Sequence, residues 1–349
     1  MSSFAIELCE RGLLPDGLTR LGMRRLMAQR IADESAGGIE QAGLRYQRML
    51  DELRQSSIAV ETAAANEQHY ELPAAFFEQV LGANLKYSSC WWGTDVATLD
   101  QAEEHMLQLT CERAELVDGQ RILELGCGWG SLTVWMARHY PQAHITAVSN
   151  SASQREYING RCRKAGLHNV EVITADANYF STDKRFDRVV SVEMFEHMRN
   201  YAQLLKRISG WLVPGGKLFV HIFCHRDLMY PFTTGDDYDW MSRYFFTGGL
   251  MPSEHTLLYF QDDLKIEVQW RVSGQHYEKT SNAWLARMDS HRDTIMPVLA
   301  GVYGEAEAQR WFQRWRMFFM AVAELFGYRG GTEWFVGHYR FCKPIAESS

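Results

Sequence analysis

The sequence predicts an α/β protein whose doubly wound, mostly parallel sheet has seven strands. Five short apolar or β-branched runs follow residue 120, and helical stretches separate the earlier ones: RILEL, HITAV, VEVITA, FDRVVSV and KLFVHIF. Such alternation is typical of a parallel sheet covered by helices on both faces. Two later runs, LKIEVQW and WFVGHYRF, have the composition of strands and bring the total to seven.

Helical segments are expected before and after these strands. Residues 18–66 carry Leu, Met, Ile and Tyr at helical spacing, which predicts a helical extension ahead of the sheet. The turn VPGG at 213–216 is expected to begin the fifth strand. Residues 305–326 predict an amphipathic helix. This helix either contacts a membrane through its Arg, Trp and Phe or, as we favour, packs on the sheet with its arginines in water.

A long aromatic segment follows the fifth strand. It spans residues 227–253 and reads DLMYPFTTGDDYDWMSRYFFTGGLMPS. A connection of this length in a compact domain is usually a binding element or a lid. We therefore expect an inserted lid after the fifth strand.

Composition limits the classes of function. The net charge of −7 argues against nucleic acid as the main partner, because a phosphate backbone needs a basic face. No apolar run has the length of a membrane-spanning helix, and the first residues lack the layout of a signal peptide, so no integral membrane association is expected. The seven cysteines form no CxxC pair, which favours reduced thiols in a cytoplasmic protein and predicts no metal site.

A glycine-rich loop directly follows the first strand. In ILELGCGWG, Gly126, Gly128 and Gly130 let the backbone turn sharply and approach a ligand closely. The dinucleotide fingerprint G-x-G-x-x-G would need glycine at position 131, which is serine, and no GK[ST] of a P-loop follows. A tight strand-to-helix turn without a ligand stays open as the alternative.

A resemblance to class I S-adenosylmethionine-dependent methyltransferases, which have a Rossmann-like core, rests on six segments that occur in order: HYELPAAFF, LKYSSCWW, ELGCGWG, EMFEHMRNY, RYFFTGGLMPS and HYEKTSNAWL. Together they are similar to the family that joins cyclopropane fatty acid synthases to coclaurine-type N-methyltransferases, and most of all to its N-methyltransferase branch. The resemblance implies a helical region over 1–100 closing over the cofactor, a cofactor-binding core over 101–225, a substrate-binding insertion with the sixth strand over 226–300, and a late helix and final strand over 301–349.

The resemblance also implies the cofactor, S-adenosyl-L-methionine, with S-adenosyl-L-homocysteine as its product. The implied contacts run from the methionine end to the adenine: Tyr87 and Ser88 over the methionine with Gly126 and Gly128 beneath it, Val192 near the sulfonium, Asn150 and Gln154 on the ribose, and Asp176 and Ala177 on the adenine. Neutral amides and carboxamides suit a cofactor without phosphates.

Two carboxylates and an imidazole lie at the end of the fourth strand, in SVEMFEHMRNY. If the chain turns helical there, Glu193 shares a face with Glu196 and His197, because residues three and four apart are neighbours. Two close carboxylates raise one pKa, and histidine titrates near neutrality, so the cluster can accept a proton at physiological pH. An alkylamine, with a pKa of about 10, needs such an acceptor before it can attack. These residues match the catalytic cluster of the N-methyltransferase branch; a helix cap and a core histidine are the alternative.

The lipid-modifying branch is the competing prediction. By the resemblance, cyclopropane synthases hold a bicarbonate base with Cys, Glu, His and Tyr, at positions that match Ser89, Glu196, His221 and Tyr277 here. The cysteine is replaced, and Glu193 stands where the synthases carry glycine. A carboxylate there can pair with an ammonium but has little use in alkene chemistry. We therefore predict an N-methyltransferase acting on a small aromatic or heterocyclic amine, with a lipid methyltransferase or a binding protein with a vestigial site as alternatives.

Aromatic side chains are expected to wall the acceptor pocket, because their faces attract sulfonium and ammonium ions. The candidates are Trp91, Trp92, Tyr244, Phe245 and Phe246, with Tyr277 beside them, and for each the ordinary alternative is a place in the core. In HIFCH, His221 and His225 have a metal-like spacing without a third ligand, so we expect His221 to face the substrate and assist proton transfer. The sequence leaves open the amine and the oligomeric state, a homodimer included.

Overall fold

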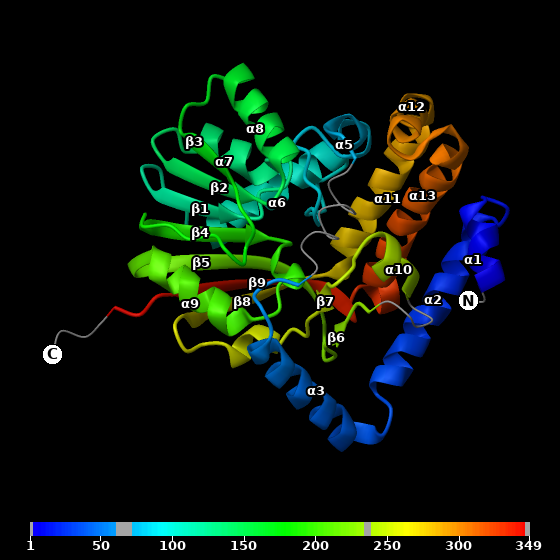
Figure 1. Ribbon diagram of the computed structural model, residues 1–349, viewed down its shortest axis with the longest axis horizontal. Coiled ribbons are helices and arrows are strands. Elements are labelled where there is room, and N and C mark those ends of the chain that lie inside the picture. The colour runs from blue at the N-terminus through cyan, green and yellow to red at the C-terminus, as the bar shows by residue number, and fades with distance from the viewer. Residues whose placement is uncertain (1–2, 61–71, 234–238, 346–349) are drawn as a thin grey trace.

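The computed structural model describes residues 3–60, 72–233 and 239–345. Its main feature is a seven-stranded sheet in the order β3-β2-β1-β4-β5-β9-β8 (Figure 1). The strands are β1 (Arg121–Leu125), β2 (His144–Ser149), β3 (Val170–Thr174), β4 (Phe186–Val192), β5 (Leu212–His225), β8 (Lys265–Val272) and β9 (Trp334–Cys342). Neighbours among β1 to β5 are parallel, and only β9 runs antiparallel to both of its neighbours. The predicted fold class and the mostly parallel, seven-stranded sheet are confirmed.

Helices cover both faces of this sheet, because successive strand residues point to opposite sides. On one face, Ile122, Val190 and Phe219 pack against α6 (Leu99–Arg113) and α7 (Ser131–His139). On the other face, Leu123 and Val189 pack against α9 (Tyr201–Trp211) and α3 (Gly38–Gln55). The remaining crossover helix, α8 (Ala152–Lys164), joins β2 to β3. The strands therefore have apolar side chains on both faces, as a doubly wound sheet requires.

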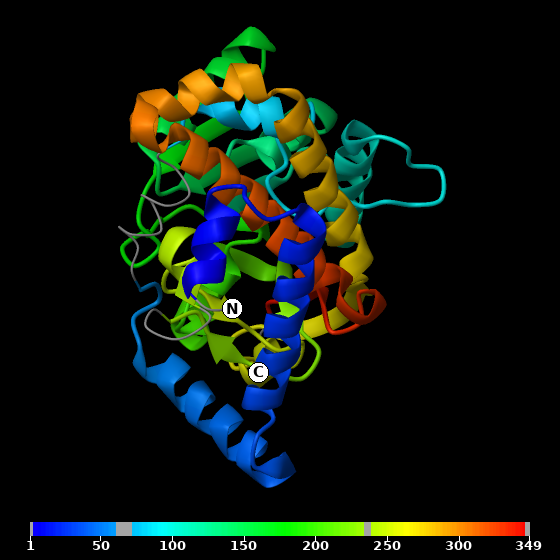
Figure 2. The same cartoon turned by 90° about the vertical axis from the view of Figure 1, so that its right-hand side faces the viewer.

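A layer of helices lies beyond the carboxyl ends of the parallel strands, on the right of Figure 1 and toward the viewer in Figure 2. It contains α1 (Ser3–Glu10), α2 (Asp16–Glu34), α5 (Ala74–Val80), α11 (Gly274–Ser290), α12 (Arg292–Tyr303) and α13 (Glu305–Gly327). The predicted amphipathic helix is α13, and it packs mainly against α11, α12 and α2 rather than flat on the sheet. Helices from the two ends of the chain thus form one wall.

The arginines of α13 differ from expectation, because they are not simply in water. Arg314 is 8% exposed, and its guanidinium contacts the carboxylate of Glu10 at 3.0 Å. Arg316 bonds to Asp16 at 2.7 Å, and also to Asp289. These arginines of the helix therefore hold α1, α2 and α11 together. None of the helices within residues 3–60, 72–233 and 239–345 combines the length and apolar composition needed to cross a membrane.

The segment after β5 is only partly regular. It contains β6 (Tyr230–Pro231), α10 (Asp239–Tyr244), β7 (Leu250–Met251) and a 3₁₀ turn over Thr256–Tyr259, and residues 234–238 lie outside the described chain. The strand pair β6–β7 is antiparallel and separate from the main sheet. One sequence expectation is wrong here: VPGG does not precede the fifth strand but lies inside β5, where Gly215 has φ +74° and the pairing with β4 shifts register.

Candidate active site

The glycine loop after β1 approaches β4 closely. Gly126 has φ +82°, and a Cβ there would lie 2.7 Å from the Cβ of Met194, so only glycine fits without a shift. Gly128 has φ +51° and faces space that holds no described atom within 4 Å of an added Cβ. Gly126 is therefore required by its close contact with Met194 and by its positive φ, whereas Gly128 is favoured by its positive φ alone and leaves open space beside the loop.

Two cavities meet at this loop, and Gly126, Gly128 and His197 line both of them. The first, which we name the strand-end cavity, lies at the carboxyl ends of β1, β2 and β3. It is lined by Ala59, Val60, Leu125, Val148, Ser149, Asn150, Ala175, Asp176, Ala177, Phe180, Met194, Met198, Leu204 and Trp211. Among these described lining residues there is no Lys or Arg, so the walls suit an uncharged, flat group with a few polar contacts.

The second cavity, which we name the aromatic cavity, lies between the sheet and the helical layer. Its aromatic lining is Tyr87, Trp129, Phe223, Phe232, Phe246, Tyr277, Trp284, Phe318 and Phe326, and its ionisable lining is Lys86, Glu124, Glu193, Glu196 and His197. Carboxylates in an aromatic chamber can bind a cation that has an apolar body, since aromatic faces also attract positive charge.

Glu193 lies directly after β4 with its backbone in the left-handed region, at φ +45°. Three donors hold its carboxylate. Oε1 accepts from the backbone N–H of Ser89 at 2.9 Å and lies 3.1 Å from His221 Nε2. Oε2 accepts from the hydroxyl of Tyr277 at 2.7 Å. A non-glycine residue with positive φ is unfavourable, so the backbone strain and the three donors together fix this carboxylate in one place.

Glu196 lies on a single 3₁₀ turn, Phe195–His197, rather than on the helical turn that we expected. Its side chain is 1% exposed, and neither carboxylate oxygen has a hydrogen-bond partner among the described residues. Burial, with the charge of Glu193 nearby, raises the pKa of Glu196 well above its ordinary value. An unpartnered buried carboxyl is costly unless something else binds it, which points to a ligand.

The environments of the two glutamates differ in a chemically useful way. Burial also raises the pKa of Glu193, but the charge of Lys86 and the hydrogen bonds from Ser89 and Tyr277 oppose that effect. Glu196 has no comparable support. Two neighbouring carboxyls whose surroundings separate their pKa values can take different roles, one as a fixed charge and one as a proton acceptor.

The expected cofactor residues divide between the two cavities. Asn150, Asp176 and Ala177 line the strand-end cavity, and the residues that line the aromatic cavity are Tyr87, Ser88, Gln154 and Val192. Asn150 and Gln154, expected together on a ribose, therefore face different chambers. The Oε1 of Gln154 accepts from the hydroxyl of Ser149 at 2.6 Å, while its buried Nε2 has no partner among the described residues.

The expected substrate-binding aromatics also divide. Phe246 and Tyr277 line the aromatic cavity, but the four others have structural surroundings. Trp91 stacks on His276 with ring centroids 4.3 Å apart, and its neighbour Trp92 donates its indole N–H to Thr280. Tyr244 lies under the guanidinium of Arg314.

Phe245 is fully buried between Trp315 and Phe318. A local sequence pattern could not predict which of Phe245 and Phe246 lies in the core. The two residues are adjacent at the end of α10, and their side chains point in different directions. The two histidines with metal-like spacing, His221 and His225, also have different surroundings. Nδ1 of His225 accepts backbone N–H bonds from Asp227 and Leu228. No group of three or more potential metal ligands occurs in the described part of the chain.

Lys86 is a site residue that the sequence reasoning missed. It is 2% exposed, lines the aromatic cavity, and donates from Nζ to the hydroxyl of Ser88 and to the carbonyl of Ser89. Burial lowers its pKa. A lysine between Leu85 and Tyr87 in a segment of few charges was a usable signal, because lysine is almost never fully buried without a reason.

The comparisons with known proteins agree with this geometry. The family model for mycolic acid cyclopropane synthetase matches residues 59–330, most of the chain. The chain belongs to this family. The chain is also similar to a cyclopropane-fatty-acyl-phospholipid synthase of Escherichia coli (strain K12), with 30% identity over 241 residues, 68% of this chain and 59% of that protein.

Similarity to several N-methyltransferases extends over more of the chain. The (S)-coclaurine N-methyltransferase of Thalictrum flavum subsp. glaucum is 39% identical over 342 residues, 97% of this chain and 95% of that protein. Pavine N-methyltransferase from the same plant is 37% identical over 294 residues, 83% of each chain.

A crystal structure of coclaurine N-methyltransferase bound to N-methylheliamine and SAH superposes with a TM-score of 0.93, at 39% identity, covering 97% of this chain and 99% of that chain. Our protein is an S-adenosylmethionine-dependent N-methyltransferase, as the resemblance predicted. The residues present fit the cofactor: Gly128 leaves space over the loop, Phe180 and Trp211 give the strand-end cavity flat walls, and the amide of Gln154 has a free buried donor.

Proposed function

We propose that this protein methylates the nitrogen of a small aromatic or heterocyclic amine that binds in the aromatic cavity. Glu193 binds the ammonium form, and Glu196 accepts its proton. The observation that carries the proposal is a buried carboxyl, that of Glu196, whose two oxygens have no partner in the described structure and which lies in a chamber of aromatic side chains. An alkylammonium supplies both the positive charge and the hydrogen-bond donors that this carboxyl lacks.

The cofactor would lie across both cavities. The residues that would hold it are Tyr87, Ser88, Gly126, Gly128, Gln154 and Val192 toward the methionine, and Asn150, Asp176 and Ala177 toward the adenosine. When bound, S-adenosylmethionine supplies an electrophilic methyl group. We also infer that the N-terminal region, residues 1–100, closes over the cofactor, since Ala59 and Val60 line the strand-end cavity, and Tyr87 and Ser88 the aromatic cavity.

Proton removal is assigned to the two glutamates by their surroundings. The three donors to Glu193 favour its ionised form, so it can attract and orient an ammonium. An ammonium beside the pair favours ionisation of Glu196 as well, and the raised pKa of that carboxyl makes it the stronger base of the two. His197 lines both cavities and completes the predicted cluster. The amine nitrogen is then left with a free lone pair in a dry chamber, where it can attack.

The position of Glu193 favours an amine over an alkene. His221 and Tyr277 match two residues that, by the family resemblance, hold bicarbonate in the lipid synthases, and in this chain both bond to the Glu193 carboxylate. A protein carboxylate therefore takes the donors that an external base would need. It also adds a fixed negative charge that suits a cationic substrate.

The cysteines bear on where the protein is located. All seven cysteines are free, six of them buried, as expected for a protein in a reducing cytoplasm. We propose a cytoplasmic enzyme that acts on a small dissolved amine, as a monomer or a homodimer, without membrane attachment.

The test is a substrate panel with purified protein and labelled cofactor. Primary, secondary and tertiary amines with aromatic or heterocyclic bodies are compared with vesicles of unsaturated phospholipid, and S-adenosylhomocysteine production is measured. We expect turnover with amines and none above background with vesicles. Turnover with vesicles alone would show a lipid-modifying enzyme and contradict the proposal, and so would cofactor binding without turnover on any amine.

A further inference from the structure

A line of three polar side chains runs from Glu193 across the middle of the sheet. His221 on β5 and His338 on β9 are directly opposite each other in the antiparallel pairing. Nε2 of His338 lies 2.9 Å from Nδ1 of His221, and Nδ1 of His338 lies 2.7 Å from the guanidinium of Arg113, in the last turn of α6. At the other end, Nε2 of His221 reaches Glu193 Oε1 at 3.1 Å.

Arg113, at the end of the line far from Glu193, determines which atom donates and which accepts in every hydrogen bond of the line. An arginine guanidinium has donors and no acceptor, so Nδ1 of His338 must accept and carries no proton. The proton of a neutral His338 ring is then on Nε2, which donates to Nδ1 of His221. His221 in turn has its proton on Nε2 and donates to Glu193. One arginine thus sets the tautomers of two histidines.

The surroundings keep both rings neutral. His221 and His338 are 0% exposed. Burial, with the positive charges of Lys86 and Arg113, lowers the pKa of both rings well below the ordinary histidine value. The charged groups that face this line from the packed elements are Arg113 on α6, Lys86 before it, Glu193 after β4 and Glu196 on the 3₁₀ turn, with the hydroxyl of Tyr277 on α11.

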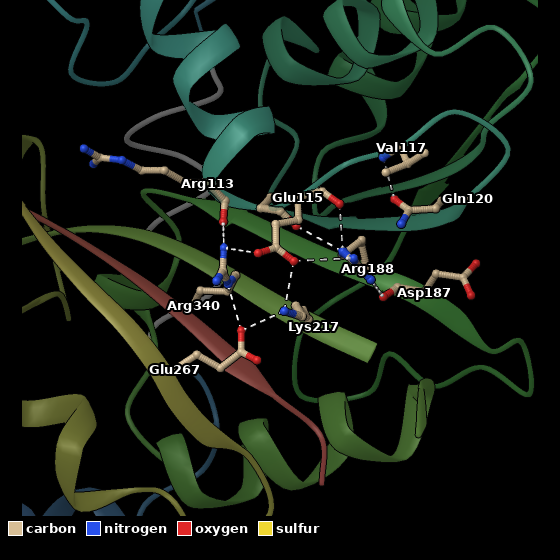
Figure 3. A network of polar contacts seen from close by, with 10 residues as sticks. Arg113, Glu115, Val117, Gln120, Asp187, Arg188, Lys217, Glu267 and Arg340 are labelled. Atoms are coloured by element: carbon tan, nitrogen blue, oxygen red, sulfur yellow. Dashed lines mark hydrogen bonds and ion pairs between the residues drawn. The ribbon is translucent and has the colours of Figure 1, made fainter. Parts of the chain in front are cut away.

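Arg113 is held in place from a second side. Its guanidinium lies 4.9 Å from the ring centroid of Trp270 on β8, and Trp270 is directly opposite His338 in the sheet. Figure 3 shows that the Arg113 side chain points away from the neighbouring charge network around Glu115, Lys217 and Arg340. Only its backbone carbonyl joins that network, as an acceptor from Arg340 at 3.2 Å. The guanidinium is therefore committed to the histidine line.

We propose that Arg113 and His338 are positioning residues for methyl transfer, which hold His221 as a fixed hydrogen-bond donor to the carboxylate of Glu193. This positioning role rests on the proposed function, because it explains how the carboxylate of Glu193 is kept fixed and ionised to bind the ammonium. His221 is then not a proton acceptor: Nε2 already carries a proton, and Nδ1 faces the N–H of His338. If both histidines carried their proton on Nδ1 instead of Nε2, Nε2 of His221 would be an acceptor, and protonation of Glu193 would be favoured. Arg113 prevents this reversed arrangement of the tautomers.

The test reads tautomers and protonation directly, on the whole protein without amine. Ring ¹⁵N shifts of His221 and His338 give the protonated nitrogen, and ¹³C carboxyl shifts give the titration of Glu193. In the wild type we expect both rings as neutral Nε2–H tautomers at every pH at which the protein is folded. A proton on Nδ1 of either ring would overturn the proposal.

Three variants complete the test. Arg113→Met should allow the reversed tautomers at low pH and raise the pKa of Glu193 by about one unit. At pH values below the acidic limb of the pH profile, this change corresponds to about a tenfold loss of kcat. Arg113→Lys keeps a donor and should restore the wild-type titration. Arg188→Met is the matched control, because Arg188 is also half-buried and lies in the charge network beside Arg113 (Figure 3). It donates to the carbonyls of Ala114 and Glu115, and no hydrogen bond joins it to either histidine among the described residues.

The outcomes separate this inference from the proposed function. A Glu193 titration that is unchanged in Arg113→Met, or equally displaced in Arg188→Met, would show a merely structural arginine and overturn the proposal. A failure of the wild type to methylate any amine would contradict the proposed function while the tautomer measurement still decides this inference.

Discussion

The strand-end cavity is built around the glycine loop and the ends of three adjacent strands, with Phe180 and Trp211 as its aromatic walls, whereas the aromatic cavity is lined by nine aromatic side chains from segments between Leu85 and Phe326. In the first, a glycine loop and short strand-to-helix connections make the shape. In the second, the sheet contributes Glu124, Val192 and Phe223, and the opposite wall comes from the inserted segment and from α11 and α13. The two cavities meet at three residues that line both of them, Gly126, Gly128 and His197.

This difference explains how one fold keeps its cofactor and changes its acceptor. The strand-end cavity depends on backbone geometry that the doubly wound sheet imposes, and ligands of such sheets lie at the carboxyl ends of the strands. The aromatic cavity depends in part on side chains from the inserted segment, α11 and α13, which lie outside the crossovers and can be replaced without disturbing the parallel strands. Changes in the strand-end cavity should therefore affect mainly the cofactor, and changes on the side of the aromatic cavity formed by the inserted segment should affect mainly the amine.

The largest expected effect tests the acidic side of the aromatic cavity. Glu196→Gln should lower kcat by about 10²- to 10⁴-fold, because it removes the proton acceptor and keeps the side-chain volume. Its cofactor dissociation constant, measured by calorimetry, should stay within about twofold of the wild type. Glu333→Gln is the control, since Glu333 is as buried but pairs with His225 away from both cavities. An unaltered kcat in Glu196→Gln would remove the base assignment.

The next largest effect is expected on cofactor affinity, from a substitution where the two cavities meet. Gly128→Ala should weaken cofactor binding at least about tenfold, because the new methyl group projects into the space that both cavities share. Gly119→Ala is the control, since Gly119 also has a positive φ, +83°, and is equally free of neighbours, but it lies in a turn before β1. Equal cofactor affinity in the two variants would show that the space above Gly128 is not used by the cofactor.

A crossed pair of substitutions tests the independence of the two cavities. Phe246→Leu should raise KM for the amine several-fold, because an aromatic face near a desolvated cation contributes about 1–2 kcal/mol. Phe180→Leu, in the strand-end cavity, should instead raise the dissociation constant of the cofactor. Steady-state kinetics and calorimetry on both variants give the four values, and equal effects on both ligands in either variant would break the comparison.

The smallest effect concerns stability and pH. The pKa of Glu196 is raised in the folded protein, so the stability that this carboxyl contributes is fully present below about pH 4.3 and is lost as pH rises through its folded pKa. Glu196→Gln removes that dependence. The melting temperature of the variant relative to the wild type should therefore rise from about pH 5 to about pH 8. A constant difference across this range would mean that Glu196 is ordinarily ionised in the fold.

The sequence was sufficient for the sheet and the glycine loop because their signals are local. Alternating strand and helix patterns placed all seven strands, and three glycines after β1 marked the turn. Glu193, Glu196 and His197 were found together because they follow one strand, although the connecting turn is 3₁₀ and not helical. Each of these features depends on residues close in the chain.

The rest depends on contacts between distant segments. Arg113 and His338 are 225 positions apart, and nothing near either residue indicates that they touch. The place of Phe245 in the core and of Phe246 in the cavity depends on how α10 packs against α13, which no local pattern records. The ion pairs of α13 with α1 and α2 were missed for the same reason.

The position of β9 has a consequence for synthesis of the protein. Of the described strands it comes last in the chain, yet it lies between β5 and β8. As the chain leaves the ribosome, β5 has a bare edge, and β8 has nothing to pair with until β9 appears. Nascent chains with unpaired edges are prone to aggregate, and pairing over such long separations is slow. This enzyme should therefore become competent in one late event, and its yield in cells should depend on chaperones that shield the open sheet until then.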